Sequence, residues 1–343
     1  MDFMTIRNPP LILEAALAEG LALGLKLKQI KGVPHLFDLE PDAWVRLAVG
    51  ETTMELPVLV RRDFTLDTLG AITHRMAQWG GKALLVAGYV PPTMADALRA
   101  MGTYFLDGAG NAFLDAPPLF VWVKGQRKRL PTEAQEPLGR AFQPRGLQVL
   151  FALLCEPGLV DRPYREIAAH AKVAHGTVGW VMAELPQLGF LGEVKGHRRL
   201  LQGERLLAQW VEGYARTLRP KLLLGRYATE KLDWAQGAEV EPYGLLLGGE
   251  PAGERLTGYL KPATATFYGE QVDPRFLAAH RLRKDPAGRV EFRRRFWAFE
   301  AEEPHLVPTI LVYADLLAIG DGRCLETAAL LLERIHARLV RPA

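Results

Sequence analysis

The sequence predicts an α/β protein built from several domains. Its 343 residues exceed the roughly 100–150 residues of a common single domain. Strand-like and helix-like segments alternate near both ends of the chain, a pattern typical of α/β domains. Residues 146–201 instead have the spacing of three short helices and a hairpin. We therefore expect an α/β domain over residues 1–130, a basic linker over 131–145, a helical domain over 146–202 and a second α/β domain over 203–343.

The N-terminal region begins with a helical pattern. Leucines recur every four residues from Leu13 to Leu25, so we expect a helix from residue 11 to about residue 28. Further along, runs rich in Val and Leu predict strands, while a Gly-Gly pair and a Pro-Pro pair mark a helix end and a helix start. The expected strands are 44–49, 56–61, 83–90, 104–106, 112–114 and 119–124, and the expected helices are 66–79 and 91–101.

The middle region predicts a winged helix-turn-helix. A first helix is expected over residues 147–155, and a second helix, capped by Asp161, runs to Ala171. A third helix starts near Ala174 and ends before Leu188. Two short strands, 190–194 and 199–201, then pair around a basic turn. In this arrangement the third helix enters the DNA major groove and the hairpin, or wing, reaches phosphates or the minor groove.

The C-terminal region predicts a second α/β body. We expect a helix over residues 205–218, mixed strands and helices over 243–301, and a helical stretch over 311–340.

Charge is distributed unevenly over the chain. The 42 Lys and Arg residues against 39 Asp and Glu residues give a net charge of only +3, which excludes a histone-like polycation and requires any nucleic-acid contact to come from a local patch. Residues 275–299 form one such patch, with eight basic and two acidic residues, and a solvated, partly ion-paired surface is an equally good reading. The stretch 126–145, which includes the expected linker, holds the basic residues Arg127, Lys128, Arg129, Arg140 and Arg145.

The candidate DNA contacts follow from the winged-helix prediction. We expect Arg165 to contact phosphate from the second helix and the wing residues to contact phosphate or the minor groove. His175 and Thr177 are expected to approach base edges, although the third helix has almost no Arg, Lys, Asn or Gln for bidentate base contacts. DNA shape would then contribute to sequence preference. A winged helix that binds only protein, or an ordinary helical hairpin, remains the alternative. The predicted DNA-binding residues are Arg165, His175, Thr177, Lys195, His197, Arg198 and Arg199.

Several short motifs together resemble a known family. Tyr164–Ala168, Val173–Gly179 and Leu188–Leu191 resemble the winged-helix segment of AbiEi antitoxins, and further motifs lie on both sides, so that the resemblance covers about residues 40–335. These motifs are 105–112, 218–222, 248–250, 296–297 and 313–317. The resemblance implies a transcriptional regulator of a type IV toxin–antitoxin system. Such a regulator represses its own operon by binding inverted repeats and counters a nucleotidyltransferase-like toxin without a stable toxin complex.

The N-terminal element order resembles the restriction-endonuclease fold. An active nuclease of that fold needs an acid on one strand and an acid-x-Lys on the next to hold Mg²⁺ and activate water. Asp42 precedes the expected strand 44–49. On the next expected strand, 56–61, Leu59 stands at the position of the acid and Arg61 at the position of the lysine. If Glu55 is taken as the acid of the acid-x-Lys pattern instead, Pro57 stands at the position of the lysine. Asp107 and Asn111 are expected turn formers. We therefore expect a degenerate nuclease-like domain.

The C-terminal region resembles a nucleotidyltransferase fold. Active members follow a Gly-Gly helix start with an Asp-x-Asp strand that binds two metal ions. Here Gly248-Gly249 precedes a helix, but the strand expected over 264–269 has no Asp, and Glu291 alone cannot hold two metals. The segment around Asp315 and Asp321 resembles the helical part of that fold. A simpler interpretation is that its charged residues form a helix cap and a surface ion pair. A metal-dependent nuclease or nucleotidyltransferase is the alternative to a non-enzymatic regulator.

Other classes of protein and site are not expected from the composition. Two cysteines, Cys155 and Cys324, cannot form a disulfide framework, and their apolar surroundings predict buried free thiols. The N-terminus lacks the pattern of a signal peptide, and no apolar run approaches the roughly 20 residues of a membrane span. We expect a cytoplasmic protein without metal or other cofactor, whose partners are double-stranded DNA and, functionally, a cognate toxin.

Overall fold

The computed structural model describes residues 9–30, 39–126 and 139–339. The chain divides into two compact units, residues 1–66 with 72–136 and residues 67–71 with 137–343, and each is described by itself. The α/β class predicted from the sequence is confirmed, because both units contain helices and a mixed sheet. In the described residues, no helix combines the length and the apolar character that crossing a bilayer requires.

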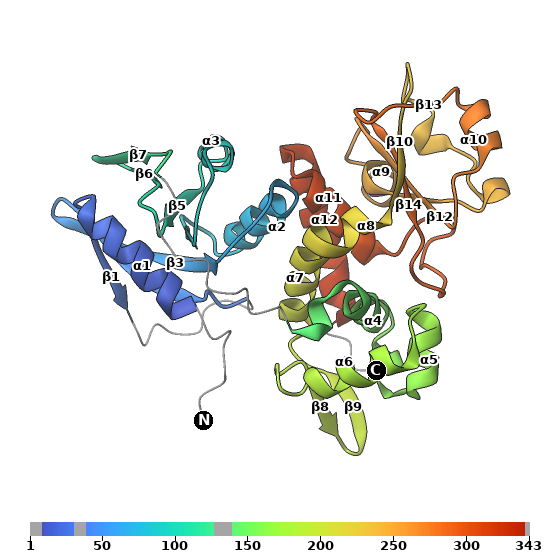
Figure 1. The fold of residues 1–343 in the computed structure, drawn as a ribbon, viewed down its shortest axis with the longest axis horizontal. Helices are drawn as coiled ribbons and strands as arrows, with labels where there is room; N and C mark the ends of the chain where they lie inside the picture. Colours follow the sequence, from blue (N-terminus) through green and yellow to red (C-terminus); the bar gives the residue numbers. More distant parts are fainter. Residues whose placement is uncertain (1–8, 31–38, 127–138, 340–343) are drawn as a thin grey trace. The chain divides into compact units, whose positions relative to one another are not determined.

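The N-terminal unit is built on a seven-stranded sheet whose strands follow chain order (Figure 1). The two central pairings, β3–β4 and β4–β5, are parallel, and the other four are antiparallel. Helix α1 packs against β3, β4 and β5, and α3 packs against β5 and β6. The elements are α1 (Pro9–Ala22), β1 (Lys26–Ile30), β2 (Ala43–Val49), β3 (Thr52–Arg61), α2 (Leu66–Ala77), β4 (Leu84–Ala87), α3 (Pro92–Ala100), β5 (Tyr104–Asp107), β6 (Ala112–Ala116) and β7 (Leu119–Val123).

The expected helix over residues 11–28 is wrong in its second half. Helix α1 ends at Ala22, and Gly24 adopts a positive φ of 82° before strand β1 begins. Leu25 and Leu27 are buried, whereas Lys26 and Lys28 are exposed, which is the two-residue alternation of a strand. The leucine spacing thus continues from a helix into a strand without a break in the sequence pattern.

The C-terminal unit starts with three helices and a hairpin, as predicted. We call residues 144–200 the helix–hairpin segment. It contains α4 (Pro144–Cys155), the short 3-10 helix η2 (Pro157–Asp161), α5 (Tyr164–His170), α6 (His175–Glu184), β8 (Leu191–Val194) and β9 (His197–Leu200). Buried Leu150, Ile167, Val178 and Val181 line the faces that these helices turn toward one another.

The rest of the unit carries a five-stranded sheet in the order β11-β12-β14-β10-β13, in which only β12 and β14 are parallel. Helix α9 packs against α11 and α12, and α7 packs against α4 of the helix–hairpin segment (Figure 1). The elements are α7 (Gly203–Gly213), the π-helical turn η3 (Tyr214–Leu218), α8 (Arg219–Leu222), β10 (Leu223–Ala228), β11 (Leu246–Gly248), α9 (Gly249–Thr257), β12 (Ala265–Gly269), α10 (Pro274–Ala279), β13 (Arg283–Lys284), β14 (Val290–Arg294), α11 (Thr309–Ile319) and α12 (Gly322–Leu339).

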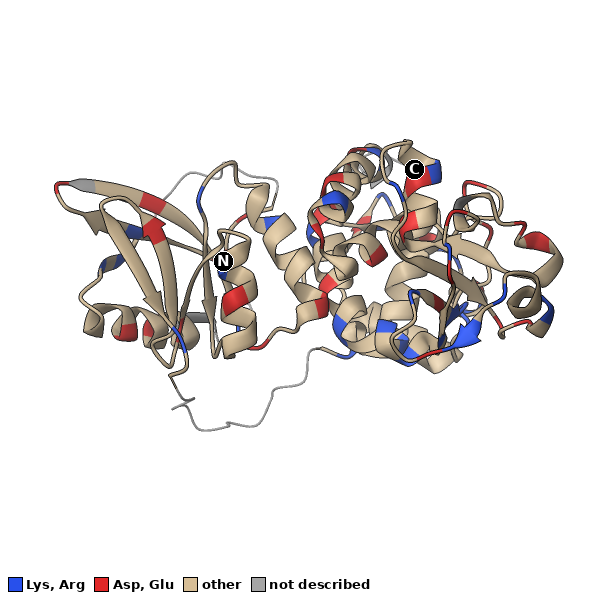
Figure 2. Ribbon diagram, turned by 90° about the horizontal axis from the view of Figure 1, so that it is seen from above, with Lys and Arg blue, Asp and Glu red and all other residues tan. Residues whose placement is uncertain are grey.

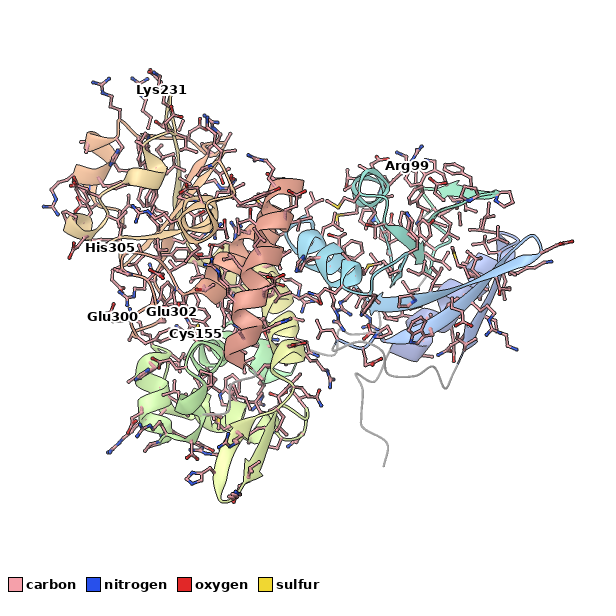
Figure 3. All side chains as sticks on the ribbon, turned by 180° about the vertical axis from the view of Figure 1, so that it is seen from behind. Arg99, Cys155, Lys231, Glu300, Glu302 and His305 are labelled. Carbon is pink, nitrogen blue, oxygen red and sulfur yellow. The ribbon has the colours of Figure 1, made fainter. Side chains whose placement is uncertain are left out.

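An aromatic cluster joins the helix–hairpin segment to the remainder of the unit. Phe151 of α4 stacks on Trp210 of α7 with ring centroids 5.2 Å apart, and it also contacts Phe296 and Phe299. The amide of Ala298 donates to the carbonyl of His170 over 2.9 Å. In Figure 3 the chain carrying Glu300 and Glu302 lies beside Cys155 at the end of α4. A continuous core therefore fixes the segment on the C-terminal body.

Two further expectations concern the cysteines and the linker. Cys155 and Cys324 are buried and form no disulfide, as predicted. Part of the basic stretch 126–145, including Arg127, Lys128 and Arg129, lies outside the described residues. Arg140 and Arg145 are described, in the 3-10 turn before α4 and in its first helical turn. The four-region division of the chain stays a prediction.

Candidate functional site

Helices α5 and α6 are joined by a tight turn. Four residues connect them, and Lys172 takes the left-handed φ of 51° that reverses the chain. The amide of Val173 donates to the carbonyl of Ala168 over 3.0 Å, which closes the turn. Helix α6 then begins at His175 and ends at Glu184, two residues before Pro186, because proline cannot continue the helix without a clash.

A stripe of small residues runs along α6, flanked by exposed His175 and half-buried Trp180. At 100° per residue, Gly176, Gly179 and Ala183 fall on one stripe opposite buried Val178, and Gly176 and Ala183 are exposed. A Cβ atom added at Gly176 or Gly179 would meet no atom within 4 Å. This stripe offers backbone and methyl surface but no bidentate hydrogen-bonding group to a partner.

The two residues expected to read bases lie on different flanks of that stripe. His175 is exposed, and its ring lies 6.2 Å from the ring of Tyr164. Thr177 is only half-buried, and its amide closes the first turn by donating to Ala174. Arg165 is exposed on α5.

The hairpin is a two-residue turn that presents Lys195 at its tip. Strands β8 and β9 pair from Leu191 with Leu200 to Val194 with His197. Lys195 and Gly196 have φ of 53° and 81°, the positive pair that a type I′ turn requires. Both turn residues are exposed, so the ammonium group of Lys195 stands at the far end of the hairpin.

Two of the predicted wing contacts are engaged within the protein. Oδ2 of Asp161 lies 2.7 Å from Nδ1 of His197, and Oδ1 accepts the Arg198 amide over 3.0 Å. The guanidinium of Arg198 donates to the carbonyl of Arg162 over 2.8 Å and lies 5.1 Å from the ring of Tyr164. The hydrogen bond from His197 is the main cause that lowers the pKa of Asp161. Arg199 is half-buried.

The prediction that Asp161 caps helix α5 is therefore wrong. Pro163 occupies the N-cap position of α5, without a side-chain hydrogen bond to the helix. Asp161 ends the preceding 3-10 helix and binds β9 instead. Sequence reasoning missed this role because the partner residues lie 36 and 37 positions further along the chain.

The basic region over residues 275–299 is smaller than its sequence suggests. Arg293 is buried, Arg275 is paired with Asp273 over 2.7 Å, and Arg295 donates to the carbonyl of Phe299. Figure 2 shows acidic and basic residues interspersed over the C-terminal unit. The exposed basic residues that remain in this region are Arg281, Arg283, Lys284, Arg289 and Arg294.

A buried polar network lies on one face of the C-terminal sheet. Asp315 of α11 is fully buried and accepts hydrogen bonds of 2.8 Å from the hydroxyls of both Tyr214 and Tyr268. Nε of Arg219 lies 3.2 Å from the same carboxylate. Burial is the main cause that raises the pKa of Tyr214 and of Tyr268, and the charge of Asp315 raises both further. Asp315 is thus neither a helix cap nor part of a surface pair.

Glu291, the carboxylate considered for metal binding, belongs to the same network. It is paired with Arg219 and Arg226 and with the guanidinium of Arg293 beside it. These charges lower the pKa of Glu291 against the opposing effect of its burial. The carboxylate is therefore ionised and already held by three guanidinium groups.

The other positions of the nucleotidyltransferase pattern also make contacts within the protein. Gly249 begins α9 with a φ of 52°, and a Cβ there would lie 2.8 Å from the Thr266 hydroxyl, so glycine is needed for this close approach. Glu250 accepts the amides of Ala263 and Thr264. Asp321 accepts the amide of Cys324 at the start of α12 and pairs with Arg323, which confirms a cap and a surface ion pair there.

In the N-terminal unit, the acids considered for nuclease chemistry have protein partners. Asp42 accepts the amide of Val60 and pairs with Arg61 over 3.1 Å, and Glu55 pairs with Arg46 over 2.6 Å. Asp107 accepts the amides of Ala109 and Asn111 and that of Val90. Its role as a turn former is confirmed.

Comparison with known proteins gives one family match. A family model described as transcriptional regulator, AbiEi antitoxin, type IV TA system matches residues 199–337. No curated protein and no solved structure matches the chain. The matched region contains the motifs around Arg219, Gly248 and Asp315. It begins after helices α4–α6, which it does not include. The chain therefore matches the AbiEi antitoxin family over residues 199–337, and the resemblance inferred from the sequence is confirmed for that part.

Proposed function

We propose that this protein is a DNA-binding transcriptional regulator that represses its own operon as the antitoxin of a type IV toxin–antitoxin system. The family match over residues 199–337 supports the regulator and antitoxin assignment. Helices α4–α6 with the hairpin β8–β9 have the element order of a winged helix-turn-helix, which supports DNA binding as the means of regulation.

The observation that carries the proposal is the surface of the helix–hairpin segment. The stripe of α6 is open at Gly176 and Gly179, where an added Cβ would meet no atom within 4 Å. Arg165 on α5 and Lys195 at the hairpin tip are exposed and positively charged. A helix that enters a groove, flanked by cations that contact phosphate, is the usual geometry of this class. Sequence preference then rests on His175, Thr177, methyl contacts and DNA shape.

A promoter–reporter assay tests the regulatory role. The intact chain, supplied from a separate plasmid, should reduce expression from the promoter region upstream of its own gene. Scrambling the inverted repeats in that region should restore expression, and the Lys195→Ala/Arg165→Ala double variant should repress less than the wild type. Equal expression with and without the protein would contradict autoregulation.

We further propose that the nuclease-like and nucleotidyltransferase-like regions are not catalytic. Glu291 is held by three guanidinium groups, and Asp42 is bound by Arg61 and the amide of Val60. Binding of Mg²⁺ would have to displace these partners. Incubation with Mg²⁺ or Mn²⁺, DNA or RNA, and labelled nucleotides should give neither cleavage nor nucleotide transfer; either product would favour the enzymatic alternative.

The cognate toxin is a functional partner in this proposal. The family description names an antitoxin, so we expect a nucleotidyltransferase-like toxin gene beside this one. Co-expression should restore growth to cells that express that toxin. An unrelated neighbouring gene, together with a lack of rescue, would contradict the antitoxin role but leave DNA binding intact.

A further inference from the structure

The hairpin is fastened to the start of α5 by one carboxylate. Asp161 accepts the amide of Arg198 through Oδ1 over 3.0 Å and contacts Nδ1 of His197 through Oδ2 over 2.7 Å. The side chain of Arg198 adds a second connection, because it donates to the carbonyl of Arg162 and lies over the ring of Tyr164. These contacts join residues 161–164, at the start of α5, to strand β9.

A two-stranded hairpin alone is at best marginally stable in water, so its tip needs an external support. At the base of the hairpin, the amide of Leu201 donates to Phe190, and Leu191 is buried. His197 is the first residue after the turn, which places the Asp161 contact close to the tip. Asp161 is thus the support nearest to Lys195.

The same contacts divide the basic residues of the hairpin into two groups. His197 and Arg198 are bound to the protein, whereas Lys195 at the tip is exposed. Phosphate contact from the tip therefore depends on Lys195, and the position of Lys195 depends on the strand that Asp161 holds.

We propose that Asp161 is a positioning residue of the DNA interface: it holds the hairpin so that Lys195 reaches a phosphate while α6 occupies the groove. This inference rests on the proposed function. Hydrogen bonding from His197 lowers the pKa of Asp161, so the carboxylate is ionised at neutral pH and places a negative charge beside the DNA.

That negative charge makes the proposal easy to contradict. If Asp161 acted only through its charge, removing it would strengthen binding to a polyanion. If Asp161 positions the hairpin, removing it weakens binding despite the more favourable charge. Glu193 provides a matched control, because it is an exposed carboxylate on the same hairpin and its side chain makes neither a hydrogen bond nor an ion pair within the described part of the chain.

The experiment measures Kd for the protein's own promoter fragment by fluorescence anisotropy, using the full chain at several salt concentrations. Glu193→Ala should bind as tightly as the wild type or more tightly. Asp161→Ala should bind more weakly, by about the same factor as Lys195→Ala. The Asp161→Ala/Lys195→Ala double variant should be no weaker than Lys195→Ala, because the aspartate acts through the lysine.

Three results would overturn the inference. The first is that Asp161→Ala binds as tightly as Glu193→Ala. The second is that Asp161→Ala weakens binding in the Lys195→Ala background as much as in the wild type, and the third is that Asp161→Asn binds like the wild type while Asp161→Ala has a lowered melting temperature. Asp161→Asn keeps an oxygen for the Arg198 amide and should fall between the wild type and Asp161→Ala. A wild-type chain that does not bind the promoter fragment would instead contradict the proposed function itself.

Discussion

Arg219 and Asp315 form an ion pair inside the C-terminal unit, with Nε of the arginine 3.2 Å from Oδ1 of the aspartate. Asp315 is fully buried and Arg219 nearly so. Both belong to motifs by which the sequence resembles the AbiEi family, and the family match includes both. Because the ion pair and its two tyrosine partners join η3, α8, α11 and β12, these motif residues hold the unit together.

Asp315→Asn should strongly destabilise the C-terminal unit. The substitution removes one of the two carboxylates that pair with the buried Arg219 guanidinium, the other being Glu291, and breaking a buried pair costs about 3–5 kcal/mol. Urea unfolding followed by tryptophan fluorescence measures the change. Glu270→Gln is the control, because it breaks the exposed pair with Lys172 and should cost less than about 1 kcal/mol. Equal effects of the two substitutions would contradict this account of the network.

Stability should fall as pH rises above about 10. The pKa values of Tyr214 and Tyr268 are raised, mainly by burial, so above the unfolded pKa of about 10 the folded state binds more protons than the unfolded state. Each tyrosine then contributes a loss of about 1.4 kcal/mol per pH unit. Unfolding measured between pH 9 and 11, with phenolate absorbance, checks this. Tyr268→Phe should make the slope shallower, and an unchanged slope would exclude that tyrosine.

Lys195→Ala should weaken DNA binding without regard to sequence. The lysine lies at the exposed hairpin tip, where we expect its ammonium group to contact phosphate. Loss of one phosphate contact lowers the slope of log K against log salt by about 1. Arg165→Ala should lower it by a similar amount. Titrations on promoter and random DNA at several salt concentrations measure both slopes, and a wild-type slope in either variant would remove that residue from the interface.

Gly176→Ala should change stability and DNA binding in opposite directions. A Cβ there meets no atom within 4 Å, so the alanine should stabilise α6, by about 0.5–1 kcal/mol. If the glycine stripe faces the groove, the added methyl group obstructs the close approach and weakens binding. Melting temperature and Kd are measured on the same preparation. Tighter binding by the more stable variant would place the interface on another face of α6.

The sequence was sufficient to predict elements whose pattern is local. The order of helices α4–α6 and the hairpin, the turn at Asp107 and the burial of Cys155 all depend on residues near in the chain. The end of α1 could not be predicted in this way, because Leu25 continues the helical spacing while already belonging to the alternation of β1.

Long-range polar partners could not be predicted from the sequence. Nothing near Asp161 indicates that its carboxylate binds β9 rather than capping α5, and Asp315 meets Tyr214 across 101 positions. The burial of Arg293 likewise depends on a distant residue, because the guanidinium of Arg293 donates a hydrogen bond to the carbonyl of Arg219. Composition therefore overestimated the basic surface over residues 275–299, since a count of charges does not show which of them are paired.

The ratio of Kd values for random DNA and for the protein's own promoter, measured with the full chain at one physiological salt concentration, tests the central claim most directly. Specific regulators bind their sites typically about 10³-fold or more tightly than other DNA. We expect a ratio of that order, and we expect it to survive Lys195→Ala while both affinities fall. A ratio near one would contradict the assignment of a promoter-specific regulator.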